Sequence, residues 1–220
     1  MRHRPGVALG LIVLAAVVGY LVGFATSSLP TSHDPDRFWI ANVGAIYSVL
    51  PFTIAVLIAY RGLGRLSTVV SGIVTCAGMV CGFYRLHAVG ADPQADVGYE
   101  ETRLQAYGRW FSQFVLGPGG APWLTIAVIV GAVAGLLAWL YVARARIWAG
   151  VLAVLPLVLE PAIRAGWRVD LPLLPAMPIT AWNATVWLIE AFVGVLAIAF
   201  VVRHGPLRGR PAQGTMPGSA

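Results

Sequence analysis

The stretch VALGLIVLAAVVGYLVGFATS, residues 7–27, contains no charged residue and decides the class of this protein. A helix of about 20 predominantly apolar residues crosses a bilayer core, and this run has that length. It is longer than the apolar region of a cleavable signal peptide, about 7–15 residues, and no clear A-x-A cleavage site follows it. The stretch is therefore predicted to be a membrane span.

Five further apolar runs of the same kind follow along the chain. They cover residues 38–60, 67–87, 122–143, 147–164 and 181–202. The sequence thus predicts an all-α fold, an integral membrane bundle of six transmembrane helices within a single domain, residues 1–204. The tail, residues 205–220, is rich in Gly, Pro and Arg and is predicted to be disordered.

Composition agrees with a membrane protein. Of 220 residues, 58% are apolar and 11% charged, whereas about a quarter of the residues of soluble domains are charged. This excludes a disordered chain, a secreted disulfide scaffold and an ordinary soluble enzyme. The net charge of +6 comes from arginines scattered singly between apolar blocks, so we expect no nucleic-acid partner. Cys76 and Cys81 lack metal-ligand spacing, and we expect neither metal nor cofactor.

The arginines predict the orientation of the spans. Nine fall on one side of a six-span arrangement: Arg2, Arg4, Arg61, Arg65, Arg144, Arg146, Arg203, Arg208 and Arg210. Six fall on the other: Arg37, Arg85, Arg103, Arg109, Arg164 and Arg168. Because cytoplasmic loops carry the excess of basic residues, both termini are predicted to be cytoplasmic in a multi-pass protein of the cell membrane.

The longest outer segment, residues 88–121, contains a candidate helix at 99–115. Its aromatic residues fall on one face: Tyr107, Trp110, Phe111 and Phe114. Such a pattern favours an extra helix lying in the outer membrane interface.

Small residues at four-residue spacing predict how the spans pack. The pairs are Gly19/Gly23, Gly78/Gly82 and Gly131/Gly135, each in a different span. Lipid supplies no hydrophobic drive between helices, so close backbone approach at small residues is a main source of association. A homodimer face on one of these helices is the alternative. Prolines inside the spans, Pro51, Pro156 and Pro161, are predicted to kink them.

Two acidic residues, Glu160 and Glu190, lie inside predicted spans. A charged side chain at membrane depth costs about 2.5–3.5 kcal/mol on insertion scales, so each marks a candidate functional site. For Glu160 the structural alternative is an i,i+4 ion pair with Arg164. Glu190 lies near mid-depth, where burial favours a neutral carboxyl group. Its structural alternative is a hydrogen bond between helices.

A polar stripe in the third span includes Ser71, Thr75, Gly78 and Gly82. If this stripe faces the two glutamates, the bundle encloses a polar pocket in its outer half. Glu160 and Glu190 are then the catalytic candidates. The predicted ligand-binding residues are Trp187, Tyr84, Arg85, Asn183, Asn42 and Arg164.

Four short motifs resemble those of small actinobacterial multi-pass membrane proteins of unknown function. They are FWIAN (38–42), GFYRLH (82–87), LEPAIRAGW (159–167) and WLIEAFVGV (187–195). In its design, a compact helical bundle with isolated carboxylates and many aromatic residues, the chain also resembles the integral-membrane terpene cyclases. Those enzymes are often described with seven spans, and this chain has six predicted ones.

The second resemblance implies an isomerase or lyase of terpenoid biosynthesis that cyclises a prenylated or epoxidised, lipid-like substrate. Glu190 would donate the initiating proton, Trp187 and Tyr84 would stabilise the carbocation, and Glu160 would be a second acid or the terminal base. No DDxxD-type cluster for a diphosphate–magnesium complex is present in the sequence. Two other functions remain open: a small proton-coupled transporter acting as a dimer, and an accessory or structural membrane protein.

Overall fold

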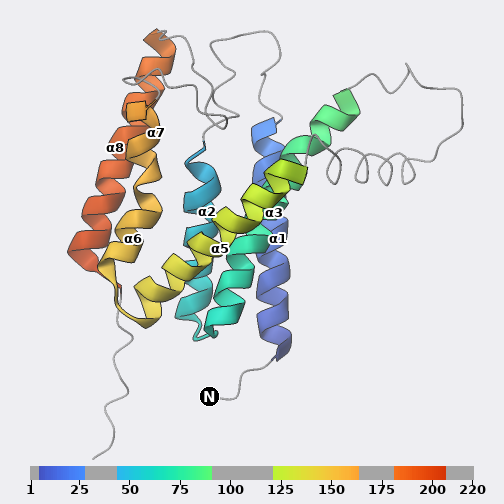
Figure 1. The fold of residues 1–220 in the computed structure, drawn as a ribbon, viewed down its shortest axis with the longest axis vertical. Helices are drawn as coiled ribbons and strands as arrows, with labels where there is room; N and C mark the ends of the chain where they lie inside the picture. The colour runs from blue at the N-terminus through green and yellow to red at the C-terminus, as the bar shows by residue number, and fades with distance from the viewer. Residues whose placement is uncertain (1–4, 28–43, 91–120, 164–180, 207–220) are drawn as a thin grey trace, which may run out of the picture.

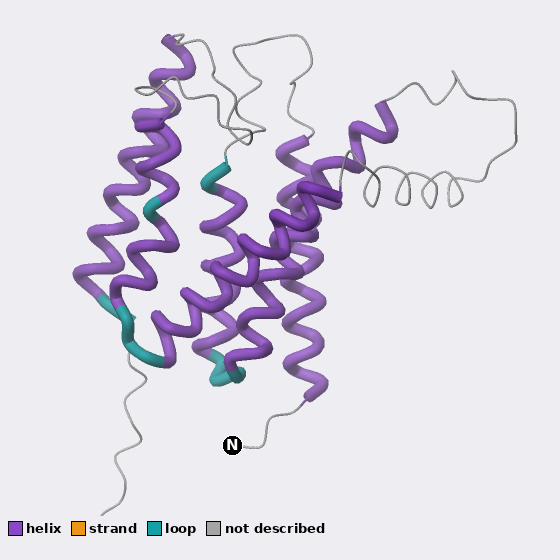
Figure 2. Tube along the Cα trace, in the orientation of Figure 1, coloured by secondary structure: helices purple, strands orange, loops and turns teal. Residues whose placement is uncertain are grey.

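The computed structural model describes residues 5–27, 44–90, 121–163 and 181–206, with only the backbone for 5, 27, 84–90 and 181–184 (Figure 1). These residues form helices joined by short turns, as predicted for an all-α protein (Figure 2). The helices are α1 Pro5–Ser27, α2 Ile46–Tyr60, α3 Arg65–Gly90, α5 Ala121–Ala143, α6 Ile147–Val154, α7 Pro156–Ala162 and α8 Ala181–His204.

Four of the described helices contain a stretch that is long and apolar enough to cross a membrane. These stretches are Gly6–Thr26 in α1, Arg65–Phe83 in α3, Ala121–Ala143 in α5 and Thr185–His204 in α8. The other two apolar stretches, Ile46–Tyr60 and Ile147–Ala162, are shorter. These four helices indicate that the protein is a multi-pass membrane protein. The predicted interfacial helix, 99–115, and most of the predicted tail, 207–220, lie outside the described residues.

The predicted glycine pairs lie where α3 packs against α1 and against α5. Gly19 and Gly23 of α1 lie against the backbone of Thr75 and Met79 in α3. A Cβ atom added to either glycine would overlap a carbonyl oxygen of α3, so only glycine permits this approach.

The same packing recurs on both sides of α3. Gly78 and Gly82 lie against α1, whereas Gly72, on another face of α3, lies against Gly131 and Gly135 of α5. The prediction that these pairs join helices within the chain is confirmed. Helix α3 is thereby held between two close neighbours.

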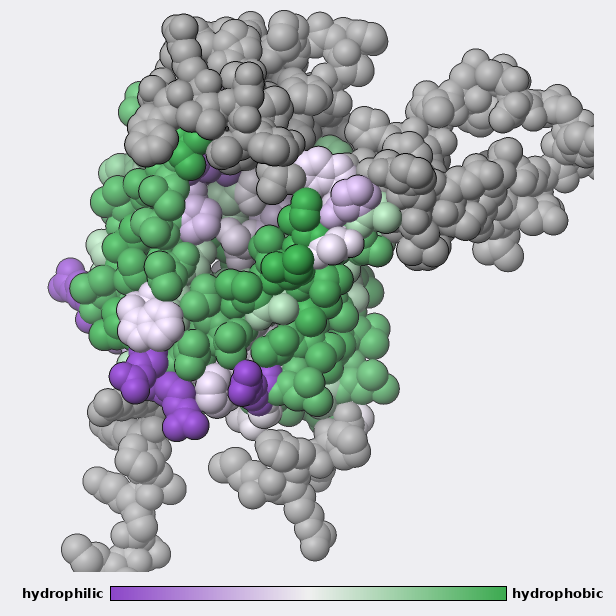
Figure 3. Space-filling view, viewed as in Figure 1, coloured by the Kyte–Doolittle hydropathy of each residue, from purple (hydrophilic) through white to green (hydrophobic). Residues whose placement is uncertain are grey.

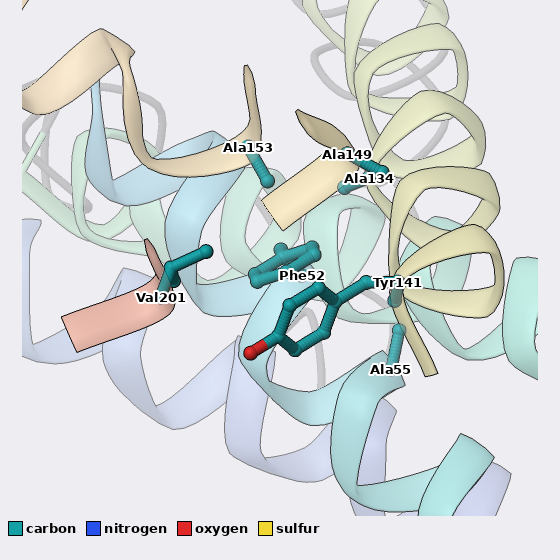
Figure 4. Close-up of a cluster of buried hydrophobic side chains, with 8 residues drawn as sticks. Phe52, Ala55, Ala134, Tyr141, Ala149, Ala153 and Val201 are labelled. Carbon is teal, nitrogen blue, oxygen red and sulfur yellow. The ribbon is translucent and has the colours of Figure 1, made fainter. Parts of the chain in front are cut away.

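A second cluster joins α2, α5, α6 and α8 near one end of the bundle (Figure 4). Phe52 of α2 and Tyr141 of α5 meet with their ring centroids 6.1 Å apart. Gly150 of α6 leaves room for the Tyr141 ring and for Val201 of α8. Small alanines fill the remainder of this cluster: Ala55, Ala134, Ala138, Ala149 and Ala153.

One of the three predicted proline kinks coincides with a helix break. Pro156 has no N–H, so it cannot donate to the preceding turn, and α6 ends at Val154 before α7 begins at Pro156. Leu155 joins the two helices in a helical conformation. Helix α2 continues through Pro51, and α7 contains Pro161.

Large apolar side chains cover the outside of the bundle (Figure 3). On α8, for example, Leu188, Phe192 and Phe200 are each more than 60% exposed. An apolar exterior of this extent is what a lipid environment requires.

Candidate functional site

Glu160 of α7 is buried, with 5% of its surface exposed, and it contacts the start of α2. Its Oε1 accepts a hydrogen bond from the N–H of Gly44 at 2.9 Å, and its Oε2 accepts one from the N–H of Ala45 at 2.5 Å. Both carboxylate oxygens therefore bind backbone of a helix that lies more than a hundred residues earlier in the chain.

The N-cap residue of α2 supplies no side-chain acceptor for the start of this helix. Its N-cap residue, Ala45, has no side chain that can accept a hydrogen bond, and Ala45 is buried away from water. A carboxylate is the favoured partner at this end of a helix because the helix dipole is positive there. Glu160 thus caps α2 from another helix.

This cap differs from the predicted i,i+4 ion pair of Glu160. Arg164, the predicted partner, lies outside the described residues, so the structure leaves that ion pair untested. Sequence reasoning missed the backbone donors because it expected one continuous span over 38–60. The described helix begins at Ile46, after a turn that contains Gly44. That glycine, a residue that favours turns, was the available signal.

Glu190 and Trp187 lie on the side of α8 that faces the bundle. Trp187 is 4% exposed, and the Oε1 atom of Glu190 is shielded from solvent. Gly194, one turn further along, lies against Leu157 and Val158 of α7. Trp187, Glu190 and Gly194 thus share an inward face of α8.

The register of α8 against α6 and α7 brings the two glutamates to one level. Val201 contacts Gly150, and Gly194 contacts Leu157 and Val158, so the helices run antiparallel with a constant offset. The same offset places Glu190 beside Pro161, the residue after Glu160. With a rise of about 1.5 Å per residue, both carboxyl groups belong to helix positions at nearly the same height.

The glycines of the polar stripe of α3 face another helix, so the condition for the predicted pocket, a stripe that faces both glutamates, is not met at these positions. Gly78 and Gly82 lie against α1. The Ser71 hydroxyl donates to the Thr68 carbonyl at 2.7 Å, and the Thr75 hydroxyl donates to the Ser71 carbonyl at 2.7 Å. These hydroxyl groups are used within their own helix, as is usual for Ser and Thr inside helices.

The remaining predicted ligand-binding residues stay predictions. Tyr84 and Arg85 fall in the part of α3, and Asn183 in the part of α8, for which only the backbone is described. Asn42 and Arg164 lie outside the described residues. From the predicted set, the structure therefore describes the side chains of Glu160, Glu190 and Trp187, with Glu160 buried against α2 and the other two on the inward face of α8.

Within the described ranges, no group of three or more His, Cys, Asp or Glu side chains could hold a metal ion. Cys76, predicted to be a small apolar filler, is buried between α3 and its neighbours and donates its S–H to the Tyr47 carbonyl at 3.4 Å. The chemistry that the described site offers is that of carboxyl groups and an indole ring.

Comparison of the chain with protein-family models, with curated proteins and with solved structures gives no match. The candidate site must therefore be interpreted from its own residues.

Proposed function

We propose that the protein crosses the membrane six times, with its arginine-rich end in the cytoplasm. The turns at 61–64 and 144–146, the start of α1 and the end of α8 lie at the same end of the bundle (Figure 2). Five arginines belong to this end: Arg61, Arg65, Arg144, Arg146 and Arg203. This grouping supports the orientation that the positive-inside rule favours.

For its activity, we propose proton-initiated cyclisation of a lipid-like polyene, prenylated or epoxidised, at Glu190. The observation that carries the proposal is the inward stripe of α8, on which a shielded carboxyl group lies one turn from a buried indole. An acid and an aromatic ring are the two groups that this reaction requires. The buried position of Trp187 is not explained by an interfacial aromatic belt.

The reaction follows from these two groups. The carboxyl O–H of Glu190 transfers its proton to a carbon of the substrate double bond, or to an epoxide oxygen, and leaves a carboxylate. In an alkene the π electrons form the new C–H bond and leave a carbocation; in an epoxide the oxygen takes the proton as O–H and the C–O bond breaks to leave the carbocation. The next double bond attacks this carbocation to close a ring. The Trp187 ring stabilises the cation by about 0.5–2 kcal/mol. Transfer of a proton from the carbon next to the final cation to the Glu190 carboxylate forms a double bond, ends the sequence and regenerates the acid.

Glu160 has a different part in this proposal from the one that the resemblance implied. Since both of its oxygens accept hydrogen bonds from α2, it is bound as an acceptor and is not placed as a second acid. Its carboxyl oxygens are electron-rich and suit stabilisation of a nearby cation. It also positions α2 beside the site.

A lipid-like substrate requires access from the bilayer. On the face seen in Figure 3, a hollow with paler, less hydrophobic atoms separates α5 from α7 and α8. Helices α5 and α6 meet at the 144–146 turn. With increasing distance from that turn, α5 runs away from α7 and α8 (Figure 1). This opening supports lateral access between the helices.

The deciding experiment compares Glu190→Gln with wild type in membranes supplied with prenylated and epoxidised polyenes. Gln keeps the shape but has no acidic proton, so product formation should fall about 10²–10⁴-fold, the usual contribution of general acid catalysis. Phe192→Leu, on the lipid-facing side of the same helix, should retain activity. Equal thermal unfolding temperatures of the three proteins would show that folding is intact. Cyclisation by Glu190→Gln at the wild-type rate would refute the assignment.

An accessory or structural role is the second candidate. The cap that Glu160 provides for α2 shows that one of the two intramembrane carboxylates has a packing function. If wild-type protein converts no polyene and Glu190→Gln lowers the unfolding temperature, Glu190 stabilises the packing of the helices. That result would favour the accessory or structural role over the cyclase.

A further inference from the structure

The arginine-rich end of the bundle contains a paired cationic site around Trp139 of α5. The guanidinium carbon of Arg65 lies 5.6 Å from the centroid of the Trp139 ring, and that of Arg144 lies 5.2 Å from it. Both distances fall within the range of cation–π contacts. Two cations from different segments are therefore held at one indole.

Backbone features fix both arginines in place. Gly72 and Val69 of α3 lie against Gly131 and Gly135 of α5, and this antiparallel register sets the first residue of α3, Arg65, at the level of Trp139. Arg144 follows the end of α5 in a tight turn. In that turn the N–H groups of Arg144 and Arg146 both donate to the Leu140 carbonyl, at 3.2 and 3.1 Å.

This site has no acidic neighbour among the described residues. The acidic residues in the described ranges are Glu160 and Glu190, each thirteen positions along a helix from this end, or about 20 Å. Arg65 and Arg144 are exposed, and so are Arg61, Arg146 and Arg203 at the same end. Like charges gathered at one ring repel each other, so this site favours the binding of an anion.

We propose that Arg65, Trp139 and Arg144 bind the phosphodiester of an anionic phospholipid. The site lies where apolar helices end, which is the level of lipid headgroups. Guanidinium groups match phosphate oxygens in a bidentate geometry. The half-buried indole between them offers an amphipathic ring that suits the boundary between headgroup and acyl chain. The ligand is thus a membrane lipid, and this inference is independent of the proposed cyclase activity.

The test is a titration of the detergent-solubilised full-length chain with phosphatidylglycerol, measured by native mass spectrometry. Each arginine near a membrane surface contributes about 1 kcal/mol to the binding of anionic lipid, which corresponds to about fivefold in affinity. The double variant R65Q/R144Q should therefore bind about 25-fold more weakly. The matched control R146Q/R203Q removes the same charge from the same end but leaves both arginines at Trp139, so it should weaken binding clearly less than R65Q/R144Q does.

Three outcomes would overturn the proposal. The first is equal loss in R146Q/R203Q, which would show unspecific attraction, and the second is equally strong binding of phosphatidylcholine to wild type. The third is displacement of the lipid by inorganic phosphate at the same concentration, which would identify a free anion as the ligand. If R65Q/R144Q does not fold, Trp139→Leu keeps both charges and should still weaken phosphatidylglycerol binding more than the control pair does.

Discussion

At the residue scale, Glu160 shows how a carboxylate within the apolar part of the bundle can be retained for structure. Burying an unsatisfied ionised group is costly, but two N–H donors and a helix N-terminus compensate the Glu160 carboxylate. The sequence showed that the residue is unusual, because few acidic residues occur inside the apolar runs. It did not show the partner, because a backbone N–H has no signature in a sequence.

The cap predicts that Glu160→Ala destabilises the protein more than Glu160→Gln. Gln retains one oxygen that can accept from α2, whereas Ala leaves the buried N–H of Ala45 and the part-buried N–H of Gly44 without this acceptor. A buried N–H group without an acceptor costs about 1–3 kcal/mol. The measurement is thermal unfolding in detergent. Phe192→Leu, which alters only the lipid-facing surface of α8, serves as the control. An unchanged unfolding temperature in Glu160→Ala would contradict the cap.

At the element scale, glycines determine which helices touch. Sequence patterns predicted the glycine pairs as packing sites correctly, since small residues at four-residue spacing have few other uses inside a span. They did not predict the neighbour of each face. Helix α3 presents Gly72 to α5 and Gly78 and Gly82 to α1, so its polar stripe could not also face the glutamates. Choosing between faces requires the three-dimensional order of the helices, which periodicity does not contain.

Glycine packing predicts a contrast between two alanine substitutions in the same helix. Gly23→Ala would drive a methyl group into the carbonyl of Met79 and should destabilise the protein by about 1–3 kcal/mol, the usual cost of overpacking. Gly10→Ala meets nothing within 4 Å and should be neutral or slightly stabilising. Thermal unfolding of both variants, with the fraction of monodisperse protein after solubilisation, measures the difference. Equal behaviour would show that α1 does not pack as described.

At the scale of the whole molecule, the charge distribution along the sequence agrees with the position of the helix ends. The predicted spans match the long helices α1, α3, α5 and α8 closely, because long uncharged runs have a single stable arrangement in lipid. They match α2 and the α6–α7 pair less well. A helix that begins at Ile46 and a break before Pro156 depend on contacts and backbone chemistry that mean hydropathy does not detect.

The arrangement predicts the location of reporter fusions. Fusions after Arg65 and after Arg146, which follow turns at the arginine-rich end, should report the cytoplasm. Fusions near Asp96 and Asp170, which follow the opposite ends of α3 and α7 along the chain, should report the outside. The physical reason is the retention of arginine-rich loops on the cytoplasmic side. A cytoplasmic signal at Asp96 would refute six spans in this orientation.

The cap on α2 also has a consequence for biogenesis. The hydrogen bond from Ala45 to Glu160 joins positions 115 residues apart, and translation at about 5–20 residues per second takes on the order of ten seconds to cover them. Throughout that interval the acceptor for the start of α2 has not yet been synthesised. The first turn of α2 can therefore become fixed only when α7 emerges, so a helix near the beginning of the chain is among the last to be completed.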